Sequence, residues 1–448
     1  MSLQFITGNS GNGKTKYLFN RIVKEAKANP RDNYLVIVPE QFTMQTQRQL
    51  VDLSENKAIM NIDVLSFKRL AYRVFDELGI TNLTVLEETG KNLVLRKLAA
   101  QEADKLGVIG RNLNRIGYIS EVKSLLSELV QYNISPEELG RYIASGRLSD
   151  TLSDKLKDVL VLYEAFEKFM QDKYITAEEI LNVLSNVAEE SAILRNSVIA
   201  FDEFTGFTPI QNQLIKKLFV ISKKIYVTLT IDCREDIFKS IGMQELFDMP
   251  KRTVKSLTEM AAFYGIEVEE PIILDKNYRL AENEELSFME QQLFRKRRCS
   301  LKKAPKHIHI DCLRDPKQEL TKIARRINEL VRNENLRYRD IAIVTGDVNI
   351  YAGYVREIFD KYNIPYFIDA TQEILFHPFI EFIRSIPDIA AQNFSADAVF
   401  RFLRCGFSEL LDSEIDVLEN YVLACGVRGK SAWDKKWVRL PKHKAGYD

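Results

Sequence analysis

The chain has 448 residues, of which 46% are hydrophobic and 28% charged, an ordinary globular composition long enough for two to four domains. Lys+Arg and Asp+Glu number 63 each, so binding to nucleic acid would have to rely on local basic surfaces rather than on bulk charge. The five cysteines form no C-x-x-C pair, which disfavours a zinc site or a disulfide framework. No apolar run approaches the roughly 18 residues of a membrane helix, and no signal peptide is visible, so the sequence predicts a cytoplasmic protein without a membrane partner.

The first 86 residues alternate short apolar segments with amphipathic ones. Strands are expected at 3–7, 34–38 and 62–65, and helices at 14–28, 43–53 and 66–78. This rhythm predicts an α/β domain, with a parallel sheet that carries helices on its faces. Further strands expected at 197–201, 225–231 and 271–274 assign residues 195–280 to the same domain.

Between these two stretches the pattern is helical. Helices are expected at 87–105, 113–131, 136–143, 152–173 and 177–187, which predicts an all-helical insertion over residues 87–194. Apolar residues recur at helical spacing between 156 and 170, as is typical of the core of a helix bundle.

A second α/β domain is expected over residues 281–376. Its expected strands lie near 308–311, 340–344 and 366–368, and its expected helices at 316–332 and 351–362. From residue 377 to 448 the pattern is helical again, and we expect this stretch to be the truncated start of another helical insertion.

The strongest chemical signal is a phosphate-loop motif. Gly8, Asn9, Ser10, Gly11, Asn12, Gly13, Lys14 and Thr15 fit G-x-x-x-x-G-K-[ST], between an expected strand and an expected helix. Glycines allow successive N–H groups to point at phosphate oxygens, Lys14 would neutralise the β- and γ-phosphates, and the Thr15 hydroxyl would ligate Mg²⁺. The motif predicts ATP and Mg²⁺ as cofactors.

Two acids supply the second half of such a site. Asp202 and Glu203 follow an apolar segment that is expected to be a strand. Asp202 would hold Mg²⁺, and Glu203 could polarise an attacking water. A strand that ends in solvated acids is the alternative interpretation, which the upstream phosphate loop disfavours.

Several segments, in order, resemble the UvrD-like superfamily 1 helicases. They include 64–72, 201–204 and 208–211, and Asn277-Tyr278-Arg279 resembles that superfamily's N-Y-R motif, whose arginine touches the γ-phosphate. The resemblance implies a RecA-like fold for the phosphate-loop domain.

A closer resemblance, over essentially the whole chain, is to the B subunits of bacterial AddAB helicase–nucleases. It is carried by the early phosphate loop and by the segments 38–43, 364–369 and 377–385. The resemblance implies DNA double-strand-break repair, a heterodimer with an AddA-like motor and nuclease partner, binding of single- and double-stranded DNA, and help in recognising the Chi sequence. The nuclease domain of that family, with its 4Fe–4S cluster held by four cysteines, is absent from this chain.

The chain also departs from a working motor. Glu235 stands where the superfamily carries a glutamine that senses the γ-phosphate, and no adenine-reading glutamine motif precedes Leu3. We therefore expect ATP binding but doubt hydrolysis by this chain. An active superfamily 1 motor, with Asp202 and Glu203 catalytic, is the alternative, and a nucleotide binder of the kinase type without DNA is a third.

The resemblance also predicts a path for a DNA strand. The residues that would line it are Gln41, Thr43, Phe67, Arg69, Tyr72 and Phe207. Aromatic rings can stack on bases, whereas the arginine and the amide suit phosphates or base edges. Each residue taken singly is more often a packing or surface residue. A basic run at 295–306 is either a phosphate contact or a solvated linker.

Overall fold

The computed structural model describes residues 1–81, 84–108, 110, 116–146, 148–170, 174–240, 242–295, 299–369 and 374–439. The chain divides into two compact units, Met1–His309 (unit 1) and Ile310–Asp448 (unit 2). In the part of the chain that is described, no helix combines the length and the apolar content needed to cross a membrane.

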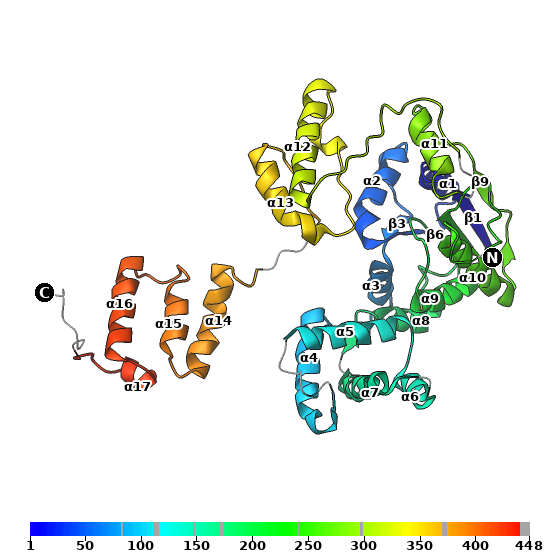
Figure 1. The fold of residues 1–448 in the computed structure, drawn as a ribbon. Coiled ribbons are helices and arrows are strands. Elements are labelled where there is room, and N and C mark those ends of the chain that lie inside the picture. The colour runs from blue at the N-terminus through cyan, green and yellow to red at the C-terminus, as the bar shows by residue number, and fades with distance from the viewer. Residues whose placement is uncertain are drawn as a thin grey trace. The chain divides into compact units, whose positions relative to one another are not determined.

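Unit 1 is built on a parallel sheet (Figure 1). The strands stand in the order β3-β2-β6-β7-β1-β8, and β9 also pairs with β1. Their bounds are β1 (Ser2–Gly8), β2 (Tyr34–Ile37), β3 (Ile62–Leu65), β6 (Val198–Phe201), β7 (Lys224–Thr230), β8 (Glu267–Val268) and β9 (Ile272–Leu274). Because all pairings are parallel, the carboxyl ends of β1 and β6 open on the same edge, separated only by β7.

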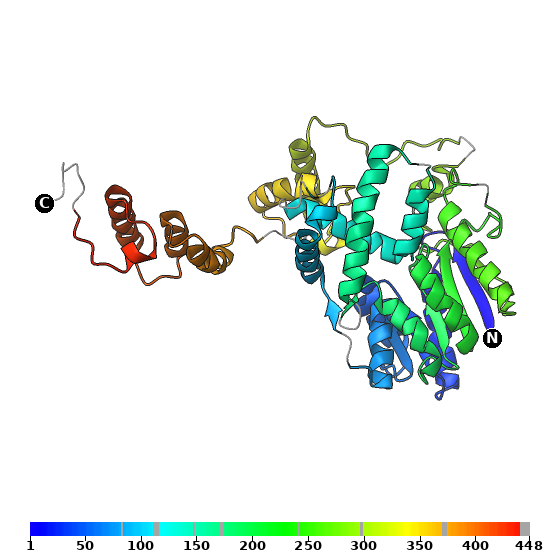
Figure 2. The same ribbon diagram turned by 90° about the horizontal axis from the view of Figure 1, so that it is seen from below.

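The strands are buried on both faces, which explains their continuous apolar sequences. In β2, Leu35 and Ile37 point into one core and Tyr34 and Val36 into the other. One face is covered by α1 (Lys14–Ala28) and α2 (Thr43–Leu53), and the opposite face by α3 (Phe67–Leu78), α8 (Ile180–Val187), α9 (Pro209–Ile221) and α10 (Asp248–Phe263). Figure 2 shows strands of this sheet between flanking helices.

The helical insertion has a core of its own. It comprises α4 (Glu88–Gln101), α5 (Ile116–Gln131), α6 (Pro136–Ala144) and α7 (Asp150–Met170), and a short parallel pair, β4 (Val85–Leu86) with β5 (Ile175–Thr176), stands at its base. Leu162 and Phe166 lie in this core, as the helical spacing of apolar residues predicts. The buried Lys91 ammonium lies 2.6 Å from Glu178 and 2.9 Å from Glu88, which satisfies its charge.

The expected elements of unit 1 are largely confirmed. β3, α1 and α2 have the expected bounds, and Ser66 is the N-cap of α3 rather than its first residue. The expected helix starts at 113–115 and ends at 171–173 lie outside the described residues. The short strand β8 was not expected.

Unit 2 differs from the expectation. Its helices α12 (Pro316–Asn333) and α13 (Val348–Lys361) are present and pack through Leu320, Ala324 and Phe359. Among the described residues after β9 no strand is formed, so the strands expected near 308–311, 340–344 and 366–368 were wrong. Val344 and Phe367 are 92% and 89% exposed, because these segments have apolar sequences but no ladder partner among the described residues.

The remaining part of unit 2 is helical, as expected from residue 377 on. Its helices are α14 (Pro378–Ala391), α15 (Ala396–Leu403), α16 (Asp412–Cys425) and the short α17 (Lys430–Trp433). Phe400, Ile415 and Val422 form their small core.

Candidate nucleotide site

The loop from Gly8 to Thr15 joins β1 to α1 at the carboxyl edge of the sheet. Gly11 and Gly13 have φ of +89° and +81°, a left-handed conformation that L side chains rarely adopt. A Cβ on Gly11 would also stand 2.8 Å from the Cβ of Arg279. Both the backbone and its neighbours therefore require glycine at this position.

Lys14 lies over the loop from which it comes. Its Nζ donates hydrogen bonds to the carbonyl oxygens of Gly8 and Asn9, each at 3.0 Å. Burial lowers the pKa of Lys14, while Glu203 and Asp202 oppose that shift. The ammonium is thus held in the place where phosphate oxygens would compete for it.

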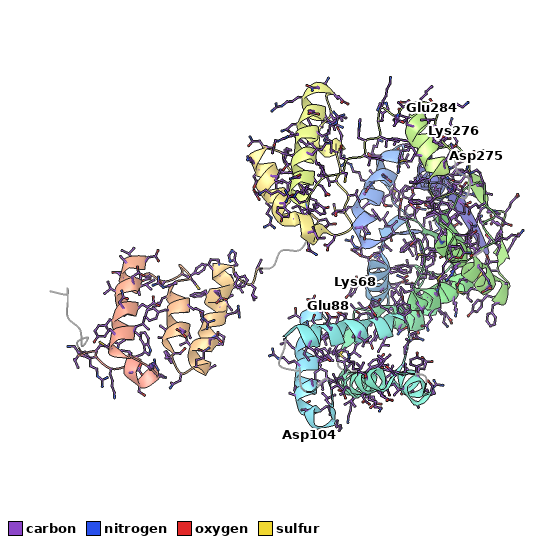
Figure 3. All side chains as sticks on the ribbon, in the orientation of Figure 1. Lys68, Glu88, Asp104, Asp275, Lys276 and Glu284 are labelled. Atoms are coloured by element: carbon purple, nitrogen blue, oxygen red, sulfur yellow. The ribbon has the colours of Figure 1, made fainter. Side chains whose placement is uncertain are left out.

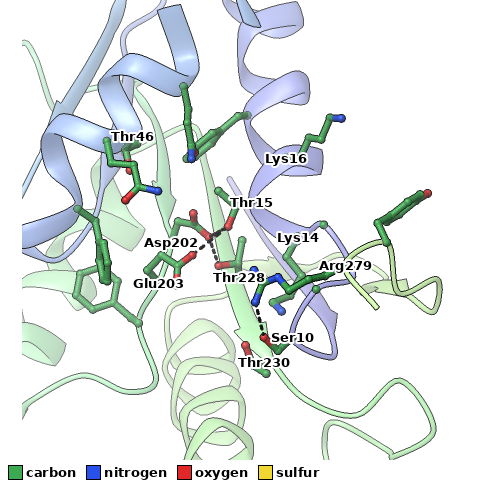
Figure 4. A pocket seen from close by; sticks show the side chains of 18 of the residues that line it. Ser10, Lys14, Thr15, Lys16, Thr46, Asp202, Glu203, Thr228, Thr230 and Arg279 are labelled. Atoms are coloured by element: carbon green, nitrogen blue, oxygen red, sulfur yellow. Dashed lines mark hydrogen bonds between the residues drawn. The ribbon is translucent and has the colours of Figure 1, made fainter. Parts of the chain in front are cut away.

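The segment Asn277-Tyr278-Arg279 contacts the tip of this loop. The N–H of Tyr278 donates to the carbonyl oxygen of Gly11 at 3.0 Å, and Asn277 Nδ2 donates to the carbonyl oxygen of Ser10 at 3.0 Å. Arg279 Nη1 lies 3.4 Å from Ser10 Oγ, as the dashed line in Figure 4 shows. The guanidinium predicted to touch a γ-phosphate therefore stands beside the loop.

The two predicted acids face the loop from the end of β6 (Figure 4). Thr15 Oγ1 lies 3.4 Å from Asp202 Oδ1 and 3.3 Å from Glu203 Oε1, and its single proton can serve only one of them at a time. Thr228, in β7, donates a hydrogen bond to Asp202 Oδ1. Asp202 is only 1% exposed, and burial raises its pKa.

The chemistry of these groups fits a divalent cation. Asp202 Oδ2 is buried without a hydrogen-bond partner, and an unpaired carboxylate oxygen is what a cation would satisfy. The hydroxyl of Thr15 and the carboxylates of Asp202 and Glu203 are oxygen ligands, which Mg²⁺ prefers. Among the described residues no cluster of three or more His, Cys, Asp or Glu could hold a metal ion, so phosphates and waters would have to complete its shell.

A cavity of about 790 Å³ opens at this point, within the usual range for small-molecule sites. It is lined by loop residues, by the two acids and by residues of α2 and the segment after β9. The polar side chains among them include Ser10, Lys14, Thr15, Lys16, Gln45, Thr46, Gln49, Asp52, Asp202, Glu203, Thr228, Tyr278 and Arg279.

Sequence reasoning missed the contacts of the loop Gly8–Thr15 with the segment after β7 and with α11 (Glu284–Gln292). The buried Asn9 accepts a hydrogen bond from the N–H of Cys233 at 2.9 Å and donates to Glu290 at 2.7 Å. Asp232 is paired with Arg234 at 2.6 Å and with Arg295 at 2.7 Å. Only the fold brings Asn9 together with the segments 232–234 and 290–295, which lie far from it in the sequence.

Glu235 is directed to another partner. Its carboxylate lies 2.8 Å from Nζ of Lys251, whose side chain is 4% exposed, and Lys251 also contacts Glu245 at 3.3 Å. Glu235 is not among the residues that line the cavity. The structure therefore places Glu235 in an ion pair away from the cavity.

The six residues predicted to contact DNA fall into a buried or partly buried group and an exposed group. Thr43 is buried and its hydroxyl donates to the carbonyl oxygen of Glu40, and Phe67 packs against Phe201 with ring centroids 5.8 Å apart, so we assign both to packing. Phe207 is partly buried in the same aromatic cluster. Gln41, Arg69 and Tyr72 are exposed after β2 and β3, two neighbouring strands of the sheet.

Comparison with known proteins identifies the family of this chain. A family described as "ADDB, N-terminal" matches residues 5–290, which covers most of unit 1 and the whole candidate site. The chain belongs to this family. Three similar relatives are each named as the B subunit of an ATP-dependent helicase/deoxyribonuclease. The one from Lachnoclostridium phytofermentans is 38% identical over 100% of this chain, and those from Clostridium tetani and Clostridioides difficile are each 34% identical over 98% of it.

These relatives are longer proteins. The chain spans 39% of the Lachnoclostridium phytofermentans protein and 38% of each of the other two. The AddB N-terminal family match ends at residue 290, whereas the similarity to the relatives continues through unit 2.

Proposed function

We propose that this AddB N-terminal chain is the helicase-like part of a helicase–nuclease that repairs DNA double-strand breaks. It binds Mg²⁺ and ATP at the loop Gly8–Thr15 and binds single-stranded DNA at the neighbouring strand ends. It works as a heterodimer with an AddA-like motor and nuclease partner on single- and double-stranded DNA in the cytoplasm. It helps to recognise Chi and is not itself a motor.

One observation carries the nucleotide part of this proposal. Lys14, Thr15, Asp202, Glu203 and Arg279 come from three separate stretches of sequence and converge on one cavity. Two cations for a phosphate chain and two carboxylates with a hydroxyl for a cation are the combination that a Mg²⁺–nucleotide site requires. The exposed ring of Tyr278, beside Gly13, offers the base an aromatic face.

The residues of this chain divide the work of binding. Backbone N–H groups of the loop and the start of α1 would bind the phosphate oxygens, and Lys14 and Arg279 would balance their charge. Thr15 and Asp202 would hold Mg²⁺, with Glu203 beside it. Mg²⁺ would supply charge neutralisation between the β- and γ-phosphates.

The contacts of Glu235 support binding without turnover. A glutamine at that position in a motor responds to the γ-phosphate, whereas Glu235 is paired with the buried Lys251. A carboxylate in contact with the γ-phosphate would also repel it. We therefore propose that the bound nucleotide stabilises the fold and does not drive movement along DNA.

The DNA and partner parts of the proposal have different support. The relatives are named as one of the subunits of a helicase/deoxyribonuclease, which supports a partner chain and a DNA substrate. Exposed Gln41, Arg69 and Tyr72 at two adjacent strand ends supply amide, guanidinium and aromatic groups suited to a single strand. The 4Fe–4S cluster is proposed for the nuclease region of the longer relatives and not for this chain.

The test is ATP binding by the purified chain, measured by calorimetry with and without Mg²⁺. Lys14→Ala should weaken binding by at least about tenfold, because it removes a charge-assisted contact worth about 1.5–3 kcal/mol. Lys16→Ala is the matched control, since Lys16 also lines the cavity but lies outside the G-x-x-x-x-G-K-[ST] pattern. Equal affinity of Lys14→Ala and the parent chain would refute the nucleotide site.

An active superfamily 1 motor is the second candidate, and the pairing of Asp202 with Glu203 beside Thr15 favours it. The two candidates separate in the full-length protein, assembled with a partner whose own ATP site is inactivated. DNA-stimulated ATP turnover that depends on Lys14 would favour the motor. Absence of turnover, with ATP binding retained, would favour a chain that binds ATP without hydrolysing it.

A further inference from the structure

The start of α3 carries a cluster of basic and aromatic side chains on its exposed side. Lys68, Arg69, Tyr72 and Arg73 are all exposed within two turns of the helix, at the carboxyl edge of the sheet. Lys68 is labelled at this helix in Figure 3. Cations interleaved with an aromatic ring are the groups with which proteins bind single-stranded nucleic acid.

Glu40 lies directly against this cluster. It follows β2, and its carboxylate accepts hydrogen bonds from the hydroxyl of Ser66 and from Nε of Arg69, the latter at 2.8 Å. Ser66 is buried and is the N-cap of α3, where it also accepts a hydrogen bond from the N–H of Arg69. The Ser66 hydroxyl and the Arg69 guanidinium are thus directed at one anion, which is supplied by the protein itself.

The charge of Glu40 is stable at neutral pH. The hydrogen bond from Ser66, together with Arg69 and Lys68, lowers the pKa of Glu40 below its ordinary value. The side chains of Glu40 and Arg69 are nevertheless 55% and 52% exposed, and an ion pair this exposed is weak. An incoming phosphate can therefore exchange with the carboxylate at little cost.

We propose that Glu40 is an internal competitor that occupies Arg69 and Ser66 until a backbone phosphate of single-stranded DNA displaces it. This inference rests on the proposed function, because it assumes that the strand passes the ends of β2 and β3. Glu40 lowers the affinity for DNA and so makes binding depend on the other contacts along the strand. It is a specificity-determining residue and does not itself contact DNA.

The experiment measures binding of a short fluorescent oligothymidylate to the chain as a function of salt. Glu40→Gln should tighten binding about two- to fivefold, the range that an exposed ion pair allows. It should also steepen the slope of log affinity against log salt by about 0.7, as expected for one more phosphate contact on a single strand. In the double variant Glu40→Gln with Arg69→Gln both gains should disappear.

The matched control is Glu55→Gln. Glu55 forms a more exposed pair with Lys27, whose side chains are 80% and 70% exposed, and follows the C-terminal end of α2, whereas Glu40 precedes its N-terminal end. This control changes the net charge by the same amount, so a general effect of charge would appear in both variants.

Three results would overturn the inference while leaving DNA binding intact. They are an unchanged affinity in Glu40→Gln, an equal gain in Glu55→Gln, and a gain that survives Arg69→Gln. If neither the parent chain nor any variant bound the oligonucleotide in a salt-sensitive way, the proposed DNA binding would fail together with the inference. Circular dichroism and retained ATP binding would verify that each variant is folded.

Discussion

Glu203 lies in the candidate site and has an unfavourable backbone conformation. Its φ is +63°, in the left-handed region, although it is not a glycine. It follows the buried Asp202, and the charge of Glu203 contributes to the raised pKa of that carboxyl. Replacing Glu203 by glycine should therefore stabilise the chain in the absence of ligands.

The size of the effect follows from two opposing contributions. The left-handed conformation costs an L-residue about 1–2 kcal/mol, and glycine removes this cost. Glycine also lowers the stability by about 0.5–1 kcal/mol, because its greater freedom stabilises the unfolded chain. The difference is about 1 kcal/mol. For a unit as large as Met1–His309, this corresponds to a rise in the melting temperature of about 2 °C.

Thermal and urea unfolding should be followed by far-ultraviolet circular dichroism. Both tryptophans, Trp433 and Trp437, lie in unit 2, so their fluorescence does not report directly on the site. Glu203→Gln is the matched control, since it removes the charge but keeps the side chain in the left-handed backbone. A gain in Glu203→Gln equal to that in Glu203→Gly would assign the effect to charge, and a loss of stability in Glu203→Gly would refute the argument from strain.

Three further predictions concern the proposed Mg²⁺ site and the ion pair between Glu235 and Lys251. Asp202→Asn should weaken the Mg²⁺-dependent part of ATP binding at least about tenfold in calorimetric titrations, since even an outer partner of a metal ligand is worth that much; undiminished dependence on Mg²⁺ would count against the metal role. Burial raises the pKa of Asp202 in the folded chain. Without metal, the Asp202 carboxyl group therefore contributes to stability below its ordinary pKa near 4, and this contribution is lost as the pH rises through the raised pKa. Affinity for Mg²⁺ should accordingly fall as the pH decreases through that raised pKa, and a pH-independent affinity would contradict this. Lys251→Met should lower the free energy of unfolding by about 1–3 kcal/mol, less than a fully buried pair because Glu235 is partly exposed, whereas Lys255→Met, at an exposed position, should leave urea midpoints unchanged.

Most of the local structure of unit 1 could be predicted from the sequence. The bounds of α1, α2 and β3 follow from apolar periodicity and from turn residues, which act over a few positions. The loop Gly8–Thr15 is equally local, because its chemistry depends on adjacent glycines and on the lysine and threonine that follow them.

Unit 2 shows the limit of the same reasoning. The segments near 340–344 and 366–368 have the composition of strands but no pairing partner among the described residues. Composition indicates a tendency to extend, whereas a strand exists only where a second segment completes the hydrogen-bond ladder.

The candidate site likewise has features that follow from local sequence and features that depend on tertiary contacts. The sequence by itself determined which residues form the loop and the acidic strand end, and from them it predicted the type of chemistry, through Lys14, Thr15 and the acids after an apolar segment. Only the tertiary structure decided that Glu235 pairs with Lys251 and that Phe67 is buried. Burial and ion pairing depend on contacts between segments that are far apart in the chain, and a local sequence pattern carries no information about such contacts.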